Sequence, residues 1–342
     1  MSRLACLPFL LGFLLASLDT FGANPADKDG TILGIQETHF TINGRPTFLL
    51  GFSYYGALGA PEEFIRQDLK EFQGHGFNWL RVWATWGGYE TNVSAVTAAG
   101  QPREPHLTRL KWLVAECDRL GLVVDVTFTR GKELPGIEGH RAAVETLVTA
   151  LKPFRNWYLD LGNERDVNDA RYVSLGELKE LREQVRMLDP ARLVTGSLGG
   201  HDLSLADVRG SLEVGGVDFI CPHRPRHRNS PGETEAETRQ ILSYMKVVGH
   251  MGPVHYQEPF RRGYTAWEPV ADDFLKDLRG ALKGGAAGWC FHNGGARSTP
   301  DGQPRRSFDL RAKRLIQQLD EEEMKVVKSV KSVVLEFEKE HR

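Results

Sequence analysis

Short apolar runs alternate along the chain with longer segments in which apolar residues recur every three or four positions. The short runs have the length of buried β-strands, and the longer segments have the periodicity of amphipathic helices. Leu107, Leu110, Val114 and Cys117 illustrate the helical spacing. The predicted strands cover 47–52, 77–83, 122–128, 157–162, 192–196, 217–221, 253–257 and 286–291. The predicted helices lie near 61–73, 106–120, 138–151, 174–188, 202–213, 233–249, 271–283 and 308–319.

This alternation predicts a parallel sheet, because parallel strands need a crossover connection that is usually a helix. Eight strand–helix units in about 290 residues fit an α/β fold of the (β/α)8 (TIM) barrel type. A doubly wound open sheet is the alternative. It usually carries a GxGxxG loop after its first strand, and Gly51 to Gly56 does not match that pattern.

A small β-hairpin is expected to precede the barrel. Asn43-Gly44 separates two extended segments, and Asn-Gly favours a two-residue turn because both positions adopt positive φ. We assign residues 23–37 to a leader and 38–342 to one barrel domain. The final segment, 321–342, has apolar residues at helical spacing and is expected to extend the last helix along the barrel exterior.

The N-terminus resembles a secretory signal. Arg3 precedes an apolar stretch that ends at Asp19, which is shorter than the ~20 residues of a membrane-spanning helix. Small residues around Gly22 suit cleavage there, so residues 1–22 are predicted as a signal peptide and the mature protein as secreted or periplasmic. No stable membrane insertion is expected after cleavage. An uncleaved membrane anchor is the alternative.

Composition narrows the classes of protein further. The 342 residues include 41% hydrophobic and 26% charged residues, which is typical of a globular chain. A net charge of −2 argues against a nucleic-acid binder, which needs a basic excess. After loss of Cys6 with the signal, Cys117, Cys221 and Cys290 remain, without CxxC spacing. We expect buried free thiols, with a single disulfide as the alternative.

Carboxylates follow two of the predicted strands. Asn163 and Glu164 come after the fourth strand, and Glu258 comes after the seventh. In a (β/α)8 barrel the strand C-termini form the active-site face, and these two strand ends can meet across its mouth. Two facing carboxylates suit glycosidic bond cleavage, in which one donates a proton and the other stays ionised.

These residues resemble clan A glycoside hydrolases. Asn163-Glu164, Glu258, Arg81 in the second strand and Trp289 in the eighth are most similar to glycoside hydrolase family 5, the cellulase and mannanase group, over about residues 38–295. The resemblance implies a retaining hydrolase of β-linked oligo- or polysaccharides that needs no cofactor and holds no metal.

The resemblance also implies a role for each residue. Glu164 is the expected general acid/base and Glu258 the nucleophile. Asn163 is expected to bind the sugar 2-hydroxyl, Arg81 to be the counter-ion of the nucleophile, and Trp289 to form a sugar platform. A nearby guanidinium favours ionised Glu258, and desolvation is expected to raise the pKa of Glu164 into the range of a proton donor.

Strict strand alternation cannot direct both Asn163 and Glu164 into one cavity. We therefore expect a twist or bulge at this strand end, as is common beside active sites.

Two strand ends depart from the family pattern. The third predicted strand ends at Thr129-Arg130 without the histidine of many members, and the sixth is followed by an arginine-rich loop. His223 is expected to take a histidine role there, and Tyr256 to supply a hydroxyl near Glu258. Basic side chains after the sixth and seventh strands form either a solvated rim or a site for an acidic sugar. They are Arg224, Arg226, Arg228, Arg261 and Arg262.

Two other functions remain open at this point. One is a carbohydrate-binding barrel without catalysis, which would keep aromatic platforms such as Trp86. The other is a metal-dependent hydrolase with His201, His223 and His227 as ligands. His223 and His227 are four apart, but the prolines at 222 and 225 exclude the helix that would bring them onto one face.

Overall fold

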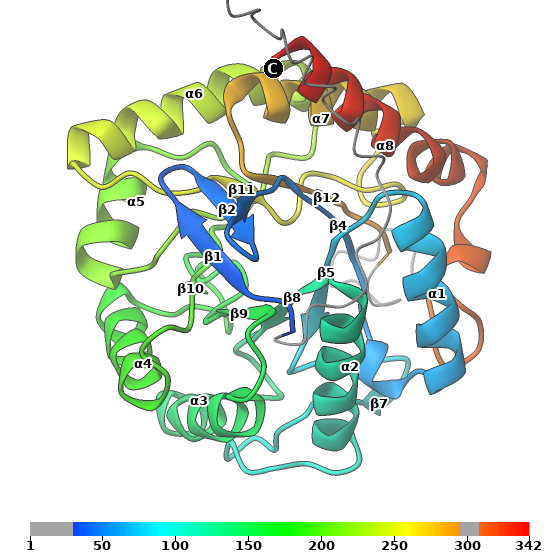
Figure 1. Ribbon diagram of the computed structural model, residues 1–342. Helices are drawn as coiled ribbons and strands as arrows, with labels where there is room; N and C mark the ends of the chain where they lie inside the picture. Colours follow the sequence, from blue (N-terminus) through cyan, green and yellow to red (C-terminus); the bar gives the residue numbers. More distant parts are fainter. Residues whose placement is uncertain (1–29, 295–307, 342) are drawn as a thin grey trace, which may run out of the picture.

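A computed structural model describes residues 30–294 and 308–341 of the chain. Its centre is a seven-stranded parallel sheet in the order β10-β9-β8-β5-β4-β12-β11 (Figure 1). The strands are β4 (Leu49–Ser53), β5 (Trp79–Trp83), β8 (Val123–Thr127), β9 (Trp157–Asp160), β10 (Val194–Thr195), β11 (His255–Tyr256) and β12 (Gly288–Phe291). Strands that lie side by side in this sheet are also consecutive among the predicted strands, and the last predicted strand pairs with the first. The alternation of strands and helices was therefore interpreted correctly.

The segment 217–223 closes the sheet into a barrel, although it is not a continuous strand. Leu198 and Pro222 form a parallel bridge on one side, and Ile220 and Val254 form another on the other side. The Asp218 amide also donates to the carbonyl of Val194 beside β10. The strand predicted over 217–221 therefore occupies the sixth position, and the fold is the predicted (β/α)8 barrel.

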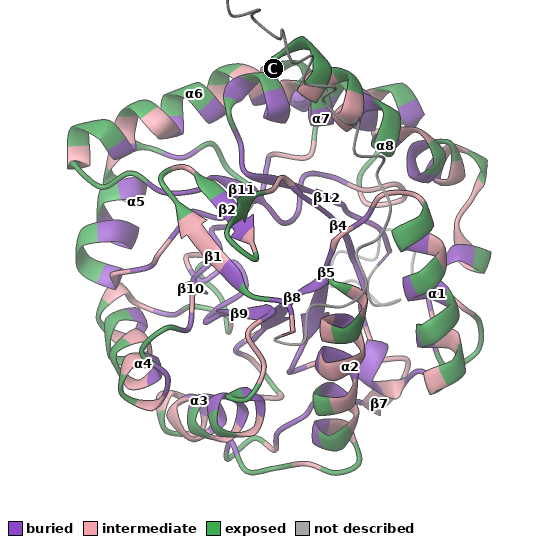
Figure 2. Ribbon diagram, in the orientation of Figure 1, coloured by how far each residue is buried: buried purple, intermediate pink, exposed green. Residues whose placement is uncertain are grey.

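Helices surround the sheet and turn their apolar faces toward it (Figure 2). They are α1 (Glu62–Gly74), α2 (His106–Leu120), α3 (Ile137–Leu151), α4 (Leu175–Leu188), α5 (Leu205–Arg209), α6 (Ser230–Val248), α7 (Ala271–Gly284) and α8 (Glu321–Glu340). After α5 the chain continues in a π-helical turn over Gly210–Gly215.

The helix predicted over 308–319 is wrong. From residue 308 onward this segment consists of turns and a short 3-10 helix, Ile316–Gln318. The eighth barrel helix is instead α8, which begins after a capping box formed by Asp320 and Glu323 and packs beside α7 (Figure 1). The C-terminal segment is thus not an extension of a helix but the helix itself.

The predicted hairpin covers the N-terminal end of the barrel. β2 (His39–Ile42) and β3 (Arg45–Pro46) pair through a turn in which Asn43 and Gly44 both have positive φ, as their sequence indicates. Phe40 is fully buried against Tyr158 and Phe219 inside the barrel. Figure 1 shows the hairpin lying across the middle of the ring of helices.

One strand lies inside the segment that we assigned to a leader. β1 (Leu33–Gln36) pairs antiparallel with β2, and the Leu33 amide donates to the carbonyl of Arg155. These contacts join residues distant in the chain, which explains why local patterning did not reveal them. The predicted signal peptide, 1–22, lies outside the described residues. Among those described, no helix is long and apolar enough to cross a membrane.

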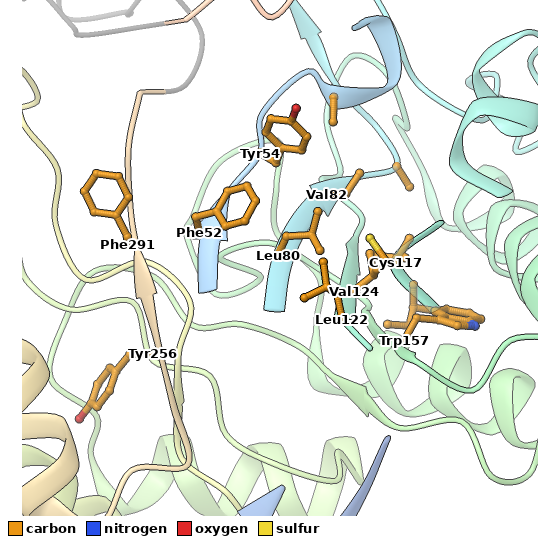
Figure 3. Close-up of a cluster of buried hydrophobic side chains, with 14 of the residues drawn as sticks. Phe52, Tyr54, Leu80, Val82, Cys117, Leu122, Val124, Trp157, Tyr256 and Phe291 are labelled. Atoms are coloured by element: carbon orange, nitrogen blue, oxygen red, sulfur yellow. The ribbon is translucent and has the colours of Figure 1, made fainter. Parts of the chain in front are cut away.

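Alternation along the strands separates an inner layer of side chains from an outer one. In β5, Trp79 and Arg81 point into the barrel. Leu80 and Val82 belong to the outer cluster of apolar side chains, which Figure 3 shows. Cys117, Cys221 and Cys290 are buried and free, as expected.

Candidate active site

At the C-terminal end of the barrel, the guanidinium of Arg81 contacts three carboxylates and one side-chain amide. Arg81 is fully buried, and its Nη1 lies 2.7 Å from Oε1 of Glu258. Its Nη2 lies 2.8 Å from Asp160, and its Nε lies 3.1 Å from Asp125. Nη2 also donates to Oδ1 of Asn163 at 2.9 Å. Burial would lower the pKa of Arg81, but the surrounding carboxylates outweigh burial and raise it, so the side chain stays charged.

Glu258 lies directly beyond β11 and is almost completely buried. Besides Arg81, it accepts a hydrogen bond from the Tyr55 hydroxyl at 3.1 Å and from Nη2 of Arg226 at 2.8 Å. Nε2 of His292 lies 3.1 Å from that same hydroxyl. Burial alone would raise the pKa of Glu258. The neighbouring side chains of His223, His292, Arg81 and Arg226 outweigh burial and hold the pKa below its usual range. The arrangement therefore favours an ionised carboxylate.

Glu164 faces the same cavity and has an unusual backbone conformation. It adopts a φ of 48°, in the left-handed region, and its amide donates to Oγ of Ser197 at 3.1 Å. Asn163 and Glu164 consequently both face the site, Asn163 toward Arg81 and Glu164 toward His223. The irregular strand end that alternation required is present, and positive φ at a non-glycine residue is its physical form.

The two glutamates meet across the cleft, with His223 between them. One side-chain atom from each of Glu164, His223 and Glu258 lies within 4.8 Å of the other two. Nδ1 of His223 lies 3.3 Å from Oε1 of Glu164 and 3.8 Å from Oε2 of Glu258. At least one oxygen of Glu164 therefore lies within 4.8 Å of an oxygen of Glu258.

The expected protonation of Glu164 is wrong for this state of the protein. Burial does favour the protonated acid, but a hydrogen bond from His223 and the charges of Arg226 and Arg171 outweigh it, and the pKa of Glu164 lies below its usual range. Arg171 forms an ion pair with Oε2, and Nη2 of Arg226 lies 3.4 Å from Oε1. Both glutamates are thus ionised, and Arg226 lies between them.

These contacts also bear on metal binding. Within the described residues, Glu164, His223 and Glu258 could each offer one ligand to an ion. However, the guanidiniums of Arg81 and Arg226 already neutralise these carboxylates and would repel a cation. His201 and His227 are exposed and lie near other carboxylates, so the three-histidine ligand set is not assembled. We assign no metal to this site.

An aromatic wall borders the two glutamates. The cleft has a volume of about 290 Å³, and Tyr55, Trp83 and Trp86 lie along one side of it. Tyr55 stacks on Trp83 with ring centroids 3.8 Å apart, and Trp86 lies 4.8 Å from Tyr55. Trp86 therefore occupies the position that its loop indicated, whereas Trp79 lies in the core at the other end of the barrel.

Two predicted site residues face away from the cleft. The hydroxyl of Tyr256 lies 2.7 Å from Oγ1 of Thr238 on α6, not near Glu258, and Figure 3 shows it directed away from the other labelled residues. Trp289 is fully buried, and its indole Nε1 donates to Asp277 on α7 at 2.7 Å. Both occupy outward positions of their strands, since the inward positions beside them hold Gln257 and Cys290.

Tyr55 provides the hydroxyl contact to Glu258 that was expected from Tyr256, and His292 lies beside both Tyr55 and Glu258. Tyr55 follows β4 and places its hydroxyl on Glu258, and His292 follows Cys290 by two residues, so it faces inward like that residue. Counting by twos along β12 identifies His292. No comparable signal identifies Tyr55, which lies in a loop.

The buried Asp277 beneath Trp289 gives a stability prediction. Burial raises its pKa to about 6, against hydrogen bonds from Thr234 and Trp289. A folded-state pKa above the unfolded value means that stability present at pH 4 is lost as pH rises through 6. Relative to Asp277→Asn, we expect the wild-type free energy of unfolding to fall by about 2–3 kcal/mol between pH 4 and 8, measured by urea unfolding. Exposed Asp272 on the same helix supplies a control, Asp272→Asn, and pH curves of wild type and Asp277→Asn that run parallel would contradict the prediction.

Comparisons with known proteins address the fold. No family model and no curated protein matches this chain. Solved structures do match, among them the endo-1,4-β-mannanase from Rhizomucor miehei, with 13% identity, a TM-score of 0.61 and coverage of 89% of this chain and 99% of that one. A glycoside hydrolase family 5 structure from Bacteroides vulgatus matches with 16% identity, a TM-score of 0.62 and coverage of 90% and 72%.

A putative glycoside hydrolase from Bacteroides vulgatus has a TM-score of 0.67 at 15% identity. The match covers 92% of this chain and 63% of that one, so this chain spans less than two thirds of that protein's length. The barrel is therefore the fold found in glycoside hydrolase family 5 and in endo-mannanases, as the resemblance in sequence implied.

Proposed function

We propose that this protein is a retaining glycoside hydrolase that acts on β-linked glycosides. The observation that carries the proposal is the pair Glu164 and Glu258, whose carboxylates face each other at close range in an aromatic-walled cleft. The similar solved structures named as mannanases and as family 5 glycoside hydrolases support the same reading. The predicted signal peptide agrees with a secreted or periplasmic enzyme that meets polysaccharides outside the cytoplasm.

Each residue has a role in this proposal. Glu258 attacks the anomeric carbon as the leaving oxygen takes a proton from Glu164, and a covalent glycosyl-enzyme results. Glu164 then removes a proton from water, which attacks the same carbon and releases Glu258. Arg81 and Tyr55 keep the nucleophile ionised and fixed in direction. Asn163 lies beside Arg81, where its amide NH₂ is available to a sugar hydroxyl.

The first step requires a proton on Glu164, whose resting state is ionised. A sugar that enters between the glutamates displaces Arg226 and water, so the balance shifts back toward burial, which favours the protonated acid. A barrel that binds sugars without cleaving them is a second candidate, because the ion pairs of Arg226 with both glutamates would block catalysis if they persisted with substrate bound.

Product stereochemistry tests the proposal. An aryl β-glycoside, chosen from gluco, manno and xylo forms, is hydrolysed in an NMR tube, and the first-formed hemiacetal is observed before it mutarotates. Two displacements at one carbon retain its configuration, so the first product is expected to be the β-anomer. An α-anomer would contradict the assignment of Glu258 as nucleophile, and absence of cleavage across the glycosides and β-glycan polymers would favour the non-catalytic candidate.

A further inference from the structure

Three arginines enter the cleft beside the two glutamates. Arg171 follows β9, Arg226 follows the segment that closes the barrel, and Arg261 follows β11. Of the five basic residues that the sequence placed near this rim, only Arg226 and Arg261 line the cleft. Arg224 turns away to Asp202, and Arg262 pairs with Asp320.

Within residues 30–294 and 308–341, Arg261 forms no ion pair with a carboxylate. In the described part of the chain no acidic oxygen lies within ion-pair range of it, and its one hydrogen bond is from Nη1 to the carbonyl of Asn293 at 3.2 Å. Its Nε is shielded from solvent and has no partner. Burial lowers the pKa of its guanidinium, and the more distant Glu258 does not compensate for this. Arg261 is only partly exposed, and such a partly desolvated charge is stabilised when a group of opposite charge binds it.

Arg226 is the neighbour of Arg261. Both guanidiniums contact the ring of Tyr264, at 4.3 Å and 4.9 Å from its centroid. Nη2 of Arg226 holds the two glutamates, whereas its Nε is buried and unpartnered. Both arginines line the cleft, and within the described residues Nη2 of Arg261 makes no hydrogen bond, so it can bind a ligand there. A guanidinium fork fits the paired oxygens of a carboxylate or a sulfate.

We propose that the natural substrate is a β-glycoside whose sugar at the cleavage site carries an anionic group, bound by Arg261 and Arg226. This inference rests on the proposed function, because it names the substrate class of the same site. A uronic acid carboxylate and a sulfate ester share the required chemistry. A neutral sugar would leave Arg261 desolvated without a counter-charge, whereas an anionic sugar completes it.

The same contact prepares the acid catalyst. An anion on Arg226 competes with Glu164 and Glu258 for that guanidinium, which weakens one of the ion pairs that keep Glu164 ionised. The anion also adds negative charge near Glu164, which favours its protonated form. An anionic substrate therefore supplies a counter-charge to Arg261 and favours the protonated form of Glu164, which is the form that can donate a proton.

Binding measurements test this inference without relying on turnover. Thio-linked β-1,4 trisaccharides, which resist hydrolysis, are titrated calorimetrically into the wild-type protein. One set compares trisaccharides of glucose, glucuronate and 6-O-sulfated glucose. The other set compares trisaccharides of mannose, mannuronate and 6-O-sulfated mannose. We expect an anionic member to bind about 10- to 100-fold more tightly than its neutral counterpart. The carboxylate and sulfate arms show which anion the arginines prefer.

Variants locate the contact. Arg261→Gln is expected to remove most of the preference for the anionic member, whereas Arg228→Gln, at an exposed position of the neighbouring loop, is expected to keep it. Equal affinity for neutral and anionic ligands would overturn the inference, and so would an equal loss of preference in both variants, since that indicates general electrostatic attraction.

The outcomes separate this inference from the proposed function. If neutral glycosides bind as well as anionic ones and are cleaved with retention, the enzyme assignment stands and the anion site fails. If the anionic ligand is preferred through Arg261 but no glycoside is cleaved, the anion site stands and the enzyme assignment fails.

Discussion

Glu258→Ala is expected to lower the turnover of an activated aryl β-glycoside by about 10⁴-fold or more, because no other group is placed to attack the anomeric carbon. Sugar binding is expected to change little, since the aromatic wall of Tyr55, Trp83 and Trp86 is untouched. Turnover measured by release of the aryl group, together with calorimetric affinity for a thio-linked sugar, separates the two effects. A carbohydrate-binding protein without catalysis would instead show no turnover in wild type and unchanged binding in the variant.

Azide makes this test specific for the nucleophile. In Glu258→Ala the lost side chain leaves room for a small anion beside Arg81 and Arg226, and azide can attack from the same face. We expect azide to restore turnover and to yield an α-glycosyl azide, since a single displacement inverts the configuration. Glu235→Ala, at a partly exposed position on α6 away from the cleft, serves as the control and is expected to need no azide. An inactive Glu258→Ala that azide does not rescue would count against the nucleophile assignment.

The barrel and the proposed catalytic pair follow from features that are visible in the sequence. Strand ends place Glu164 and Glu258 at one face of the barrel, and Arg81 interrupts an apolar strand in which only an inward position with acidic partners can hold it. The Asn43-Gly44 turn is a local signal, so it was predicted, whereas β1 depends on pairing with β2 and was not.

The errors about Tyr256 and Trp289 come from treating every residue near a strand end as a cleft residue. Within the strands, alternation assigns the two sides: Gln257 and Cys290 face inward, so Tyr256 and Trp289 before them face outward. Along the fourth strand Tyr158 and Asp160 face inward, so alternation places Glu164 inward and Asn163 outward. Both face the site only because the strand end is irregular, with positive φ at Glu164, which neither composition nor spacing reveals.

The electrostatic state of Glu164 could not be predicted from the sequence. It depends on Arg171 and Arg226, which reach the carboxylate from two different loops. Sequence patterning gives the position of a loop along the chain but not its path in space, so it predicted desolvation and missed the cations that reverse its effect. The eighth helix was misplaced for a different reason. Its capping box at Asp320 and Glu323 is a local sequence signal, but the apolar residues just before it led to a predicted helix at 308–319.

Arg81→Met is expected to lower the free energy of unfolding by about 3–5 kcal/mol, because it leaves the carboxylates of Asp125, Asp160 and Glu258 buried without their shared cation. Burial already raises the pKa of Asp125 to about 7 even with Arg81 in contact. Without the guanidinium, the protein must protonate these groups to remain folded, so the loss is expected to grow as pH rises. Urea unfolding at pH 5 and pH 8 measures both effects.

Two further variants make the result interpretable if Arg81→Met does not fold. Arg81→Lys keeps one positive charge but cannot reach all of the carboxylates, so an intermediate loss is expected. Adding Asp125→Asn to Arg81→Met removes one stranded carboxylate and is expected to recover part of the stability, which a double-mutant cycle quantifies. Arg239→Met, which breaks an exposed ion pair with Glu235, is expected to cost no more than about 0.5 kcal/mol. If Arg81→Met cost no more than that surface control, the carboxylates at the centre of the barrel would not depend on Arg81, and its role as counter-ion of Glu258 would fail with them.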